Sequence, residues 1–183
     1  MRIISGLYKG RRFTPPASLK ARPTTDFARE GLFNVLANNV DIEDAQVLDL
    51  FVGSGSISFE FLSRGASLVT GVELNQQHIL FVKKVADQLA IKNLRILKTD
   101  VFRYIGTSSQ TFDIIFADPP YDLPQLGMLP DLIMRSSLLR KDGLFILEHG
   151  KSSLFTNHPN YEETRSYGNV HFSFFRHSSE EPV

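Results

Sequence analysis

The residues of this sequence best suited to chemistry follow residues 112–117, an apolar run rich in β-branched and aromatic side chains that predicts a buried strand. The run stops at Asp118-Pro119-Pro120-Tyr121. Two successive prolines cannot continue a sheet, because each has a fixed φ and no N–H, so they present Asp118 and Tyr121 from a stiff, extended loop. Asp-Pro-Pro could also be a simple turn, but the aromatic residue directly after it favours a binding site.

Asp-Pro-Pro-Tyr resembles the motif of class I methyltransferases that act on an exocyclic amine of a nucleobase or on an amide nitrogen. An aromatic amine is a poor nucleophile, because its lone pair is delocalised into the ring. Acceptors placed on its two N–H groups favour a pyramidal nitrogen that can attack, and the Asp118 carboxylate and the Pro119 carbonyl could be those acceptors. Tyr121 could stack on the flat base. The resemblance therefore assigns the catalytic role to Asp118, Pro119, Pro120 and Tyr121.

A second set of candidate residues lies upstream. A hydrophobic strand at 46–51 runs into Gly53-Ser54-Gly55 and then a helix, an arrangement that lets the backbone approach a bound nucleotide closely. Glu73 follows Gly53 by about 20 residues at the end of the next strand, where an acidic residue binds ribose hydroxyls in nucleotide folds. Asp100, after the third strand, could accept from an adenine amine, cap the helix at 101, or do both.

These residues follow successive strands, so they meet at the carboxyl edge of the sheet, where ligands bind in doubly wound folds. S-adenosylmethionine fits them better than a nicotinamide dinucleotide, which would favour a third glycine at Ser58 and a proton relay in place of Asp-Pro-Pro-Tyr. The predicted cofactor-binding residues are Asp49, Phe51, Gly53, Gly55, Glu73, Leu74, Asp100, Val101 and Asp118. Glu148 and His149, at the end of a fifth strand, could line the pocket, but the structural interpretation is favoured.

The alternation of strands and helices from Gln46 onward predicts a parallel sheet covered on both faces. We expect strands near 46–51, 68–73, 94–98, 112–117 and 143–148, and helices at roughly 56–64, 75–90, 101–106 and 125–139. Strands at 160–167 and 170–177, joined at Gly168-Asn169, predict a closing hairpin. The predicted fold class is α/β: a Rossmann-like, seven-stranded, mostly parallel sheet with a C-terminal antiparallel hairpin. One domain is expected over 1–183, with a core at 41–177 and a tail at 178–183.

The N-terminal extension, residues 1–40, carries the positive charge of the chain. The formal net charge is zero, yet residues 1–30 hold seven Lys and Arg against two Asp and Glu, and the rest holds thirteen against eighteen. Such a cluster is either a solvated loop or a phosphate-contacting surface. We expect a small β-hairpin at 1–16, and then a helix capped by Thr24, Thr25 or Asp26 that runs to about Asn38.

The motifs together resemble one family over residues 1 to about 150. Residues 1–6 with Lys9-Gly10-Arg11, residues 22–26 with Arg29-Glu30, residues 32–34, residues 49–55 and the Asp-Pro-Pro-Tyr motif are similar to the RsmD family, bacterial 16S ribosomal RNA guanine-N2 methyltransferases. Members of the family usually carry Arg-Val where Phe27-Ala28 stands here.

The resemblance implies an enzyme that transfers one methyl group from S-adenosylmethionine to N2 of a guanine in 16S ribosomal RNA. Because a chain of 183 residues has little surface for reading a long RNA, we also expect the 16S RNA to be part of an assembled or assembling small ribosomal subunit. The resemblance also implies roles for the matching residues: the acids and glycines at the strand ends hold the cofactor, residues 118–121 hold the guanine, and the basic N-terminus holds RNA. The predicted RNA-binding residues are Lys9, Arg11, Arg12, Arg22 and Arg29.

Two other functions remain open at this stage. An adenine-N6 DNA methyltransferase could share Asp-Pro-Pro-Tyr, and a non-catalytic RNA-binding assembly factor could retain the fold. No metal site is predicted, because cysteine is absent and the five histidines are scattered. The lack of cysteine and of any stretch near ~20 apolar residues predicts a cytoplasmic protein that does not bind membranes.

Overall fold

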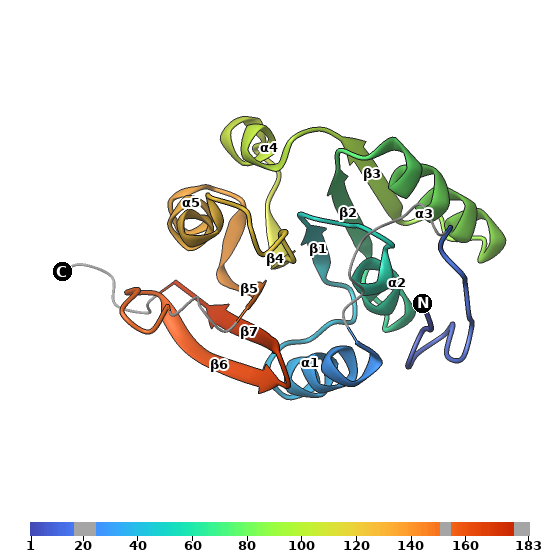
Figure 1. The fold of residues 1–183 in the computed structure, drawn as a ribbon, viewed down its shortest axis with the longest axis horizontal. Helices are drawn as coiled ribbons and strands as arrows, with labels where there is room; N and C mark the ends of the chain where they lie inside the picture. The colour runs from blue at the N-terminus through green and yellow to red at the C-terminus, as the bar shows by residue number, and fades with distance from the viewer. Residues whose placement is uncertain (17–24, 151–154, 178–183) are drawn as a thin grey trace.

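The centre of the molecule is a seven-stranded sheet with the strand order β3-β2-β1-β4-β5-β7-β6 (Figure 1). The computed structural model describes residues 1–16, 25–150 and 155–177. Strands β1 to β5 are parallel, and β7 pairs antiparallel with both β5 and β6. The strands are β1 (Gln46–Asp49), β2 (Leu68–Glu73), β3 (Leu94–Lys98), β4 (Phe112–Ala117), β5 (Leu139–His149), β6 (Tyr161–Tyr167) and β7 (Val170–Phe175). The predicted fold class, including the C-terminal hairpin, is confirmed.

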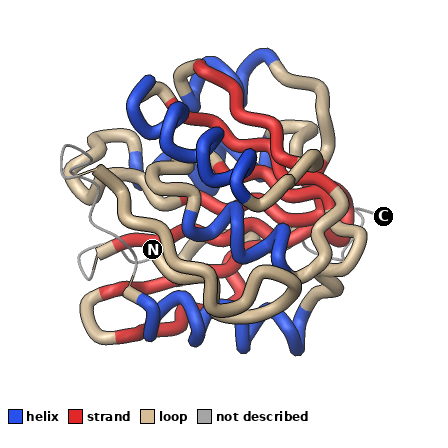
Figure 2. The backbone as a smooth tube through the Cα atoms, turned by 90° about the vertical axis from the view of Figure 1, so that its right-hand side faces the viewer, coloured by secondary structure: helices blue, strands red, loops and turns tan. Residues whose placement is uncertain are grey.

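Helices cover both faces of the sheet (Figures 1 and 2). Successive side chains of a strand point to opposite faces, so Val47 packs in one hydrophobic cluster and Leu48 in the other. The first cluster includes side chains of three helices, and the second includes side chains of two. The helices are α1 (Asp26–Asn39), α2 (Ser56–Ser63) and α3 (Gln76–Gln88) on the first face, and α4 (Val101–Thr107) and α5 (Leu129–Arg135) on the second.

The connection between β4 and β5 differs from the predicted helix at 125–139. A 3₁₀ turn, η1 (Leu126–Met128), precedes α5, which begins with Pro130 in its first turn and ends before Ser136. The Ser136 hydroxyl donates to the carbonyl of Ile133 and accepts from the N–H of Leu138, and such local bonds compete with helix continuation. Strand β5 consequently begins at Leu139, earlier than the predicted residue 143, and Leu139 pairs with Phe112.

The predicted hairpin at 1–16 forms only one isolated bridge, between Arg2 and Arg12. The segment is instead attached to α2. The carboxylate of Glu60 accepts from the N–H groups of Ile4 and Ser5 at 2.8 and 3.0 Å, and the Ser63 hydroxyl accepts from the N–H of Tyr8 at 2.9 Å. Backbone hydrogen bonds from Ile3 to Arg11 and from Phe13 to Met1 join the ends of the two arms, but the pairing goes no further because a helix accepts the N–H groups that follow Ile3.

Gly6 is required at the closest point of this attachment. Its φ is +79°, and a Cβ built on it would lie 1.8 Å from the carbonyl oxygen of Ser63. Only glycine avoids this clash and adopts that backbone conformation without strain. The N-terminal segment therefore lies directly against the last turn of α2.

The strand order brings several loops to one edge of the sheet. Strands β1 and β4 are neighbours whose connections leave in opposite directions, to β2 and to β5, so a crevice opens beyond their carboxyl ends. The β6–β7 turn reaches the same edge, because His149 of β5 opposes His171, and Tyr167 opposes Val170 still further along. We call this side of the molecule the carboxyl edge.

Candidate cofactor and substrate site

The loop between β1 and α2 is built around two glycines with positive φ. Gly53 has a φ of +53° and Gly55 a φ of +77°. A Cβ on Gly55 would lie 2.8 Å from the ring of Phe59 and 3.0 Å from Val82, so glycine lets this turn pack directly against its own core. Glycine turns of this kind, between a strand and a helix, also let a bound nucleotide approach the backbone.

Glu73 holds this loop at the carboxyl end of β2. One carboxylate oxygen accepts from the N–H of Gly53 at 2.9 Å and contacts Nδ1 of His78 at 3.1 Å, and the other accepts from the N–H of Asn75 at 2.7 Å. Each carboxylate oxygen can accept more than one hydrogen bond, so these contacts orient the group without filling its capacity. Glu73 is therefore positioned beside the glycine loop, as the sequence predicted.

Asp49 lies beneath the same loop and not at its surface. Its carboxylate is buried and accepts from the Ser58 hydroxyl at 2.6 Å. Burial raises the pKa of Asp49 to about 6, and hydrogen bonds from Ser58 and from the Phe51 backbone offset part of that rise. The sequence reasoning treated Ser58 only as a missing glycine, whereas its buried hydroxyl fixes the carboxylate that supports the loop.

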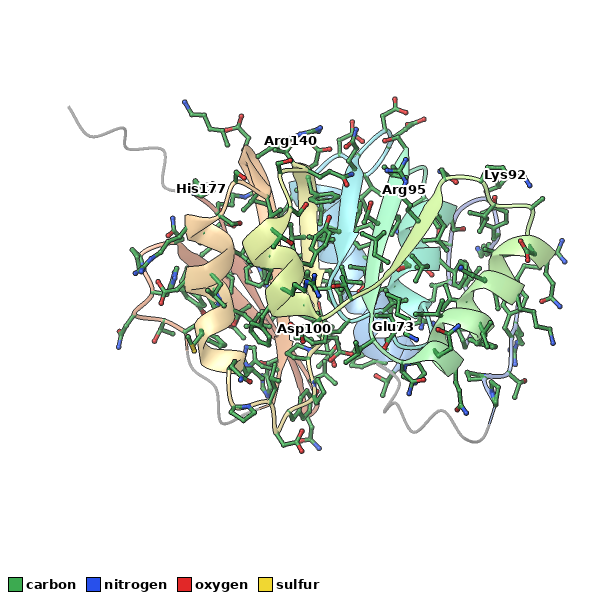
Figure 3. The ribbon with its side chains drawn as sticks, turned by 90° about the horizontal axis from the view of Figure 1, so that it is seen from above. Glu73, Lys92, Arg95, Asp100, Arg140 and His177 are labelled. Atoms are coloured by element: carbon green, nitrogen blue, oxygen red, sulfur yellow. The ribbon has the colours of Figure 1, made fainter. Side chains whose placement is uncertain are left out.

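Two further predicted cofactor residues belong to the start of α4. The Asp100 carboxylate caps the helix by accepting from the N–H of Arg103 at 3.0 Å, and it is exposed at the carboxyl edge. Figure 3 shows Asp100 and Glu73 at this edge, with Arg95 and Arg140 at the opposite one. The side chain of Val101 is buried, so only its backbone N–H, which has no partner within the helix, is suited to a ligand.

Leu74 directly follows Glu73 and is 63% exposed. An apolar side chain in that position offers a surface on which a flat ring can pack. Phe51 is half-buried against the second hydrophobic cluster. The described residues at this edge thus combine a glycine loop, two carboxylates and an apolar surface, which together fit a nucleoside.

The Asp-Pro-Pro-Tyr loop lies next to this set, after β4. Asp118 is half-buried and Pro119 is buried, while Tyr121 is 40% exposed. The Tyr121 hydroxyl donates to the Glu148 carboxylate at 3.2 Å, and Glu148 is buried at the end of β5. The sequence reasoning favoured a structural role for Glu148, but its contact with Tyr121 connects it to the candidate substrate loop.

His149, the neighbour of Glu148, belongs to a buried hydrogen-bonded chain. Its Nδ1 contacts the carbonyl of Gly150 at 2.9 Å and its Nε2 contacts the Ser173 hydroxyl at 2.7 Å. Burial lowers the pKa of His149, which favours the neutral ring. Because a carbonyl can only accept, Nδ1 is the donor and Nε2 accepts from Ser173. This arrangement matches the structural role that the sequence reasoning favoured for His149.

The predicted RNA-binding cations are placed differently from one another. Lys9, Arg11 and Arg12 are exposed on the N-terminal segment. Arg29 is only 1% exposed, and its guanidinium donates to the carbonyl of Arg2 and to Asp26. The prediction that Arg29 contacts RNA phosphates is therefore wrong: its charge is enclosed, and it attaches the N-terminal segment to α1. Arg22 lies outside the described residues.

Within the described ranges, no group of three or more His, Cys, Asp or Glu side chains is arranged to hold a metal ion. In the same part of the chain, no helix is long and apolar enough to cross a membrane.

The predicted N-terminal cap of α1 is found at Thr25, whose hydroxyl accepts from the N–H of Ala28 at 3.1 Å.

Comparison with known proteins identifies the family. A family model described as conserved hypothetical protein 95 matches residues 1–176. The ribosomal RNA small subunit methyltransferase D of Escherichia coli is 37% identical over 156 residues, a match that covers 81% of this chain and 74% of that protein. This chain belongs to the ribosomal RNA small subunit methyltransferase D family. Membership confirms the resemblance that the sequence motifs indicated.

Solved structures place this methyltransferase D family member among proteins of the same fold. A putative methyltransferase from Escherichia coli, yhhF, has a TM-score of 0.82 and 31% identity, with 96% of each chain covered. The 16S rRNA N2 G1207 methyltransferase of Thermus thermophilus, in complex with AdoMet and guanosine, has a TM-score of 0.68 and 21% identity, covering 86% of this chain and 44% of that one. The second likeness concerns the fold alone.

Proposed function

We propose that this methyltransferase D family member transfers a methyl group from S-adenosylmethionine to the exocyclic N2 of a guanine in 16S ribosomal RNA. The observation that carries the proposal is the position of the Asp-Pro-Pro-Tyr loop. Tyr121 is hydrogen-bonded to Glu148 at the carboxyl edge, beside the glycine loop that Glu73 holds. Methyl donor and acceptor sites thus follow neighbouring strands, β1 and β4.

The carboxyl edge suits the proposed cofactor. Glu73 would accept from the ribose hydroxyls, the loop at Gly53 and Gly55 would face the nucleoside, and Leu74 would cover the adenine. Asp100 and the N–H of Val101 would meet the edge of that base. When bound, S-adenosylmethionine supplies a methyl group activated by a sulfonium.

The residues of the Asp-Pro-Pro-Tyr loop orient the acceptor. Asp118 and the Pro119 carbonyl would accept from the two N–H groups of the guanine amine, which favours a nitrogen lone pair that points at the methyl group. Tyr121 would stack on the base, which must leave its paired position to expose the amine. Most of the rate comes from this alignment, for which effective-molarity arguments allow roughly 7–11 kcal/mol.

Asp118 acts mainly as an orienting group. A carboxylate is a poor base toward a neutral aromatic amine, but the amine becomes acidic as the new bond forms. The proton therefore leaves late, to Asp118 or to water. The loop holds Asp118 rigidly for this purpose, because two prolines follow it.

We further propose that the substrate is an assembled or assembling small subunit. The attachment of the N-terminal segment to α2 through Glu60 and Ser63 supports a single domain, in which the extension and the core act together. Such a compact unit would read the shape of a folded target and not a long stretch of RNA sequence.

The decisive experiment is mass-spectrometric nucleoside analysis of ribosomal RNA from cells with and without the gene. We expect loss of one N2-methylguanosine from 16S RNA and its return when purified protein and S-adenosylmethionine are added to small subunits. Methylation of adenine in DNA, or no change in any modified nucleoside, would contradict the proposal.

A further inference from the structure

A groove of about 630 Å³ lies between α1 and β6, on surface that the proposed function does not use. Figure 1 shows the end of β6 beside α1. We call it the α1–β6 groove. The lining residues that matter here are Phe27, Glu30, Asn34, Asn38, Arg165 and Tyr167.

Two aromatic rings form one end of the α1–β6 groove. Phe27 is 71% exposed, and its ring meets Tyr167 edge to face with 5.8 Å between centroids. Tyr167 lies against Gly31, where a Cβ would come within 2.0 Å of the phenol ring. Glycine weakens a helix interior, so its presence within α1 is explained by the space that Tyr167 occupies. The aromatic pair is thus held in place, with most of the Phe27 ring open to a ligand.

The rest of the groove offers both hydrogen-bond donors and hydrogen-bond acceptors. Glu30, Asn34 and Asn38 are spaced by four residues, which places them in one row along α1. Asn38 uses one of its two N–H donors for the carbonyl of Asn34. Of the two charged lining residues, Glu30 is acidic and Arg165 forms an ion pair with Glu163 at 2.6 Å. This distribution of charge favours an uncharged group with donors and acceptors over a phosphate, and a nucleobase has that chemistry beside a flat face for stacking.

The aromatic end of the groove lies at the carboxyl edge. Tyr167 opposes Val170 beyond the end of β5, whereas Asp118 follows β4 at the same edge. Strands β4 and β6 are three strand spacings apart, which corresponds to roughly 14 Å. A few nucleotides of single-stranded RNA can cover that distance. A base near the target guanine could therefore reach the groove.

We propose that the α1–β6 groove binds an unpaired base of the substrate RNA, a few nucleotides from the guanine that is methylated. The base stacks on Phe27, and the polar row of α1 contacts its edge. This inference rests on the proposed function, because it takes the ligand from the same RNA.

Steady-state methylation of small subunits from cells lacking the gene tests the groove. Phe27→Ala should raise KM for the subunits by about ten-fold, the scale of one lost stacking contact, with kcat and the affinity for S-adenosylmethionine unchanged. Phe27→Trp, which keeps a ring, should restore KM. Leu80→Ala, which removes another exposed side chain of the same face (58% exposed), is the matched control. Equal KM values for Phe27→Ala and Leu80→Ala would overturn the proposal.

Ultraviolet crosslinking identifies the occupant without requiring turnover. Peptides that contain Phe27 or Tyr167 should be linked to a nucleotide of 16S RNA in the complex with subunits. Links from these peptides only to a ribosomal protein would overturn the inference and indicate a protein-docking surface. A link to RNA in a protein that transfers no methyl group would support the groove and refute the proposed function.

Discussion

At the level of single residues, the proposed function assigns the side chains of the carboxyl edge to two different ligands. Glu73 is assigned to the cofactor and Asp118 to the amine. Glu73→Ala should weaken S-adenosylmethionine binding by at least about ten-fold, since hydrogen bonds to a charged group contribute roughly 1.5–3 kcal/mol each.

Asp118→Ala should lower kcat by at least about a hundred-fold and leave the cofactor affinity within a few-fold. Calorimetry and turnover assays measure the two effects.

The separation of these effects is the test. Normal cofactor binding by Glu73→Ala would mean that the carboxylate only holds the glycine loop. Parallel loss of both properties in Asp118→Ala would show that Asp118 maintains the pocket, and the orienting role would then be rejected.

Because Tyr121 and Glu148 are hydrogen-bonded to each other, substitutions of these two residues should have related effects on substrate binding. Glu148→Ala removes the acceptor of the Tyr121 hydroxyl, so the ring that would stack on guanine loses its orientation. We expect Glu148→Ala and Tyr121→Phe each to raise KM for the RNA substrate several-fold, and the double variant to be no worse than the more severe single one. Glu148→Gln, which retains an acceptor oxygen, should be close to wild type. Additive losses in the double variant would show that the two residues act independently.

The raised pKa of Asp49 predicts that the free energy of unfolding depends on pH. Burial raises its pKa to about 6 from 3.8, so the native state binds the proton more tightly than the unfolded state. The resulting stabilisation is complete below the unfolded pKa and is lost as the pH rises through about 6. Asp49→Asn should therefore be more stable than wild type at neutral pH, by an amount on the order of 3 kcal/mol, and the difference should shrink toward pH ~4.

Urea unfolding of wild type and Asp49→Asn across this pH range measures the effect. Asp142→Asn, at an exposed position, is the matched control. A stability difference between wild type and Asp49→Asn that does not change with pH would indicate that Asp49 keeps the same charge in the folded and unfolded states.

At the scale of elements, the N-terminal segment depends on α2. Glu60 is fully buried and accepts from two backbone N–H groups as well as from Arg64. Glu60→Ala should lower the free energy of unfolding by roughly 3 kcal/mol, because buried N–H groups lose their acceptor, and should expose residues 1–16 to proteases. Denaturant unfolding and limited proteolysis check this, with exposed Glu43→Ala as the control. Unchanged cleavage of the segment would contradict the anchoring role of Glu60.

The elements differ in how well the sequence predicts them. The positions of β1 to β4 are predicted within a few residues, because their apolar runs end at glycine, acid or proline signals, and the C-terminal hairpin is predicted by its turn at Gly168-Asn169. The form of α5 was not predicted, since the bonds of Ser136 that end it carry no distinctive pattern. The reduction of the N-terminal hairpin to a single bridge depends on Glu60, more than 50 residues away in the chain.

The candidate site, like the elements, can be predicted from the sequence only in part. The carboxyl-edge position of Glu73, Asp100 and Asp118 follows from the alternation of strands and helices along the chain, because the carboxyl ends of parallel strands share one edge of the sheet. The burial of Arg29 cannot be predicted from the sequence. An arginine near the start of a helix has the same local sequence pattern whether its side chain contacts a phosphate or a backbone carbonyl. The α1–β6 groove brings together residues from opposite ends of the chain, so no local pattern could indicate it.

For the whole molecule, the separation of charge predicts salt-dependent binding. Arg11 and Arg12 are exposed, and cations that neutralise phosphates release counterions. Replacing both with Ala should lower the affinity for RNA and flatten the slope of log affinity against log salt by roughly one unit per lost phosphate contact. Lys83→Ala with Lys84→Ala, which removes the same charge from exposed positions of α3, should change the slope little. Identical slopes for the two double variants would reject the N-terminal contact.

The attachment of the basic segment to α2 also has a mechanical consequence. The helix that carries Glu60 and Ser63 begins directly after Gly55, and its eight residues span only about 12 Å. One short rigid rod thus has the proposed cofactor loop at one end and the proposed RNA-binding segment at the other. A shift of either end moves the other, so the free energies of binding the two substrates should be coupled, and by equal amounts in both directions.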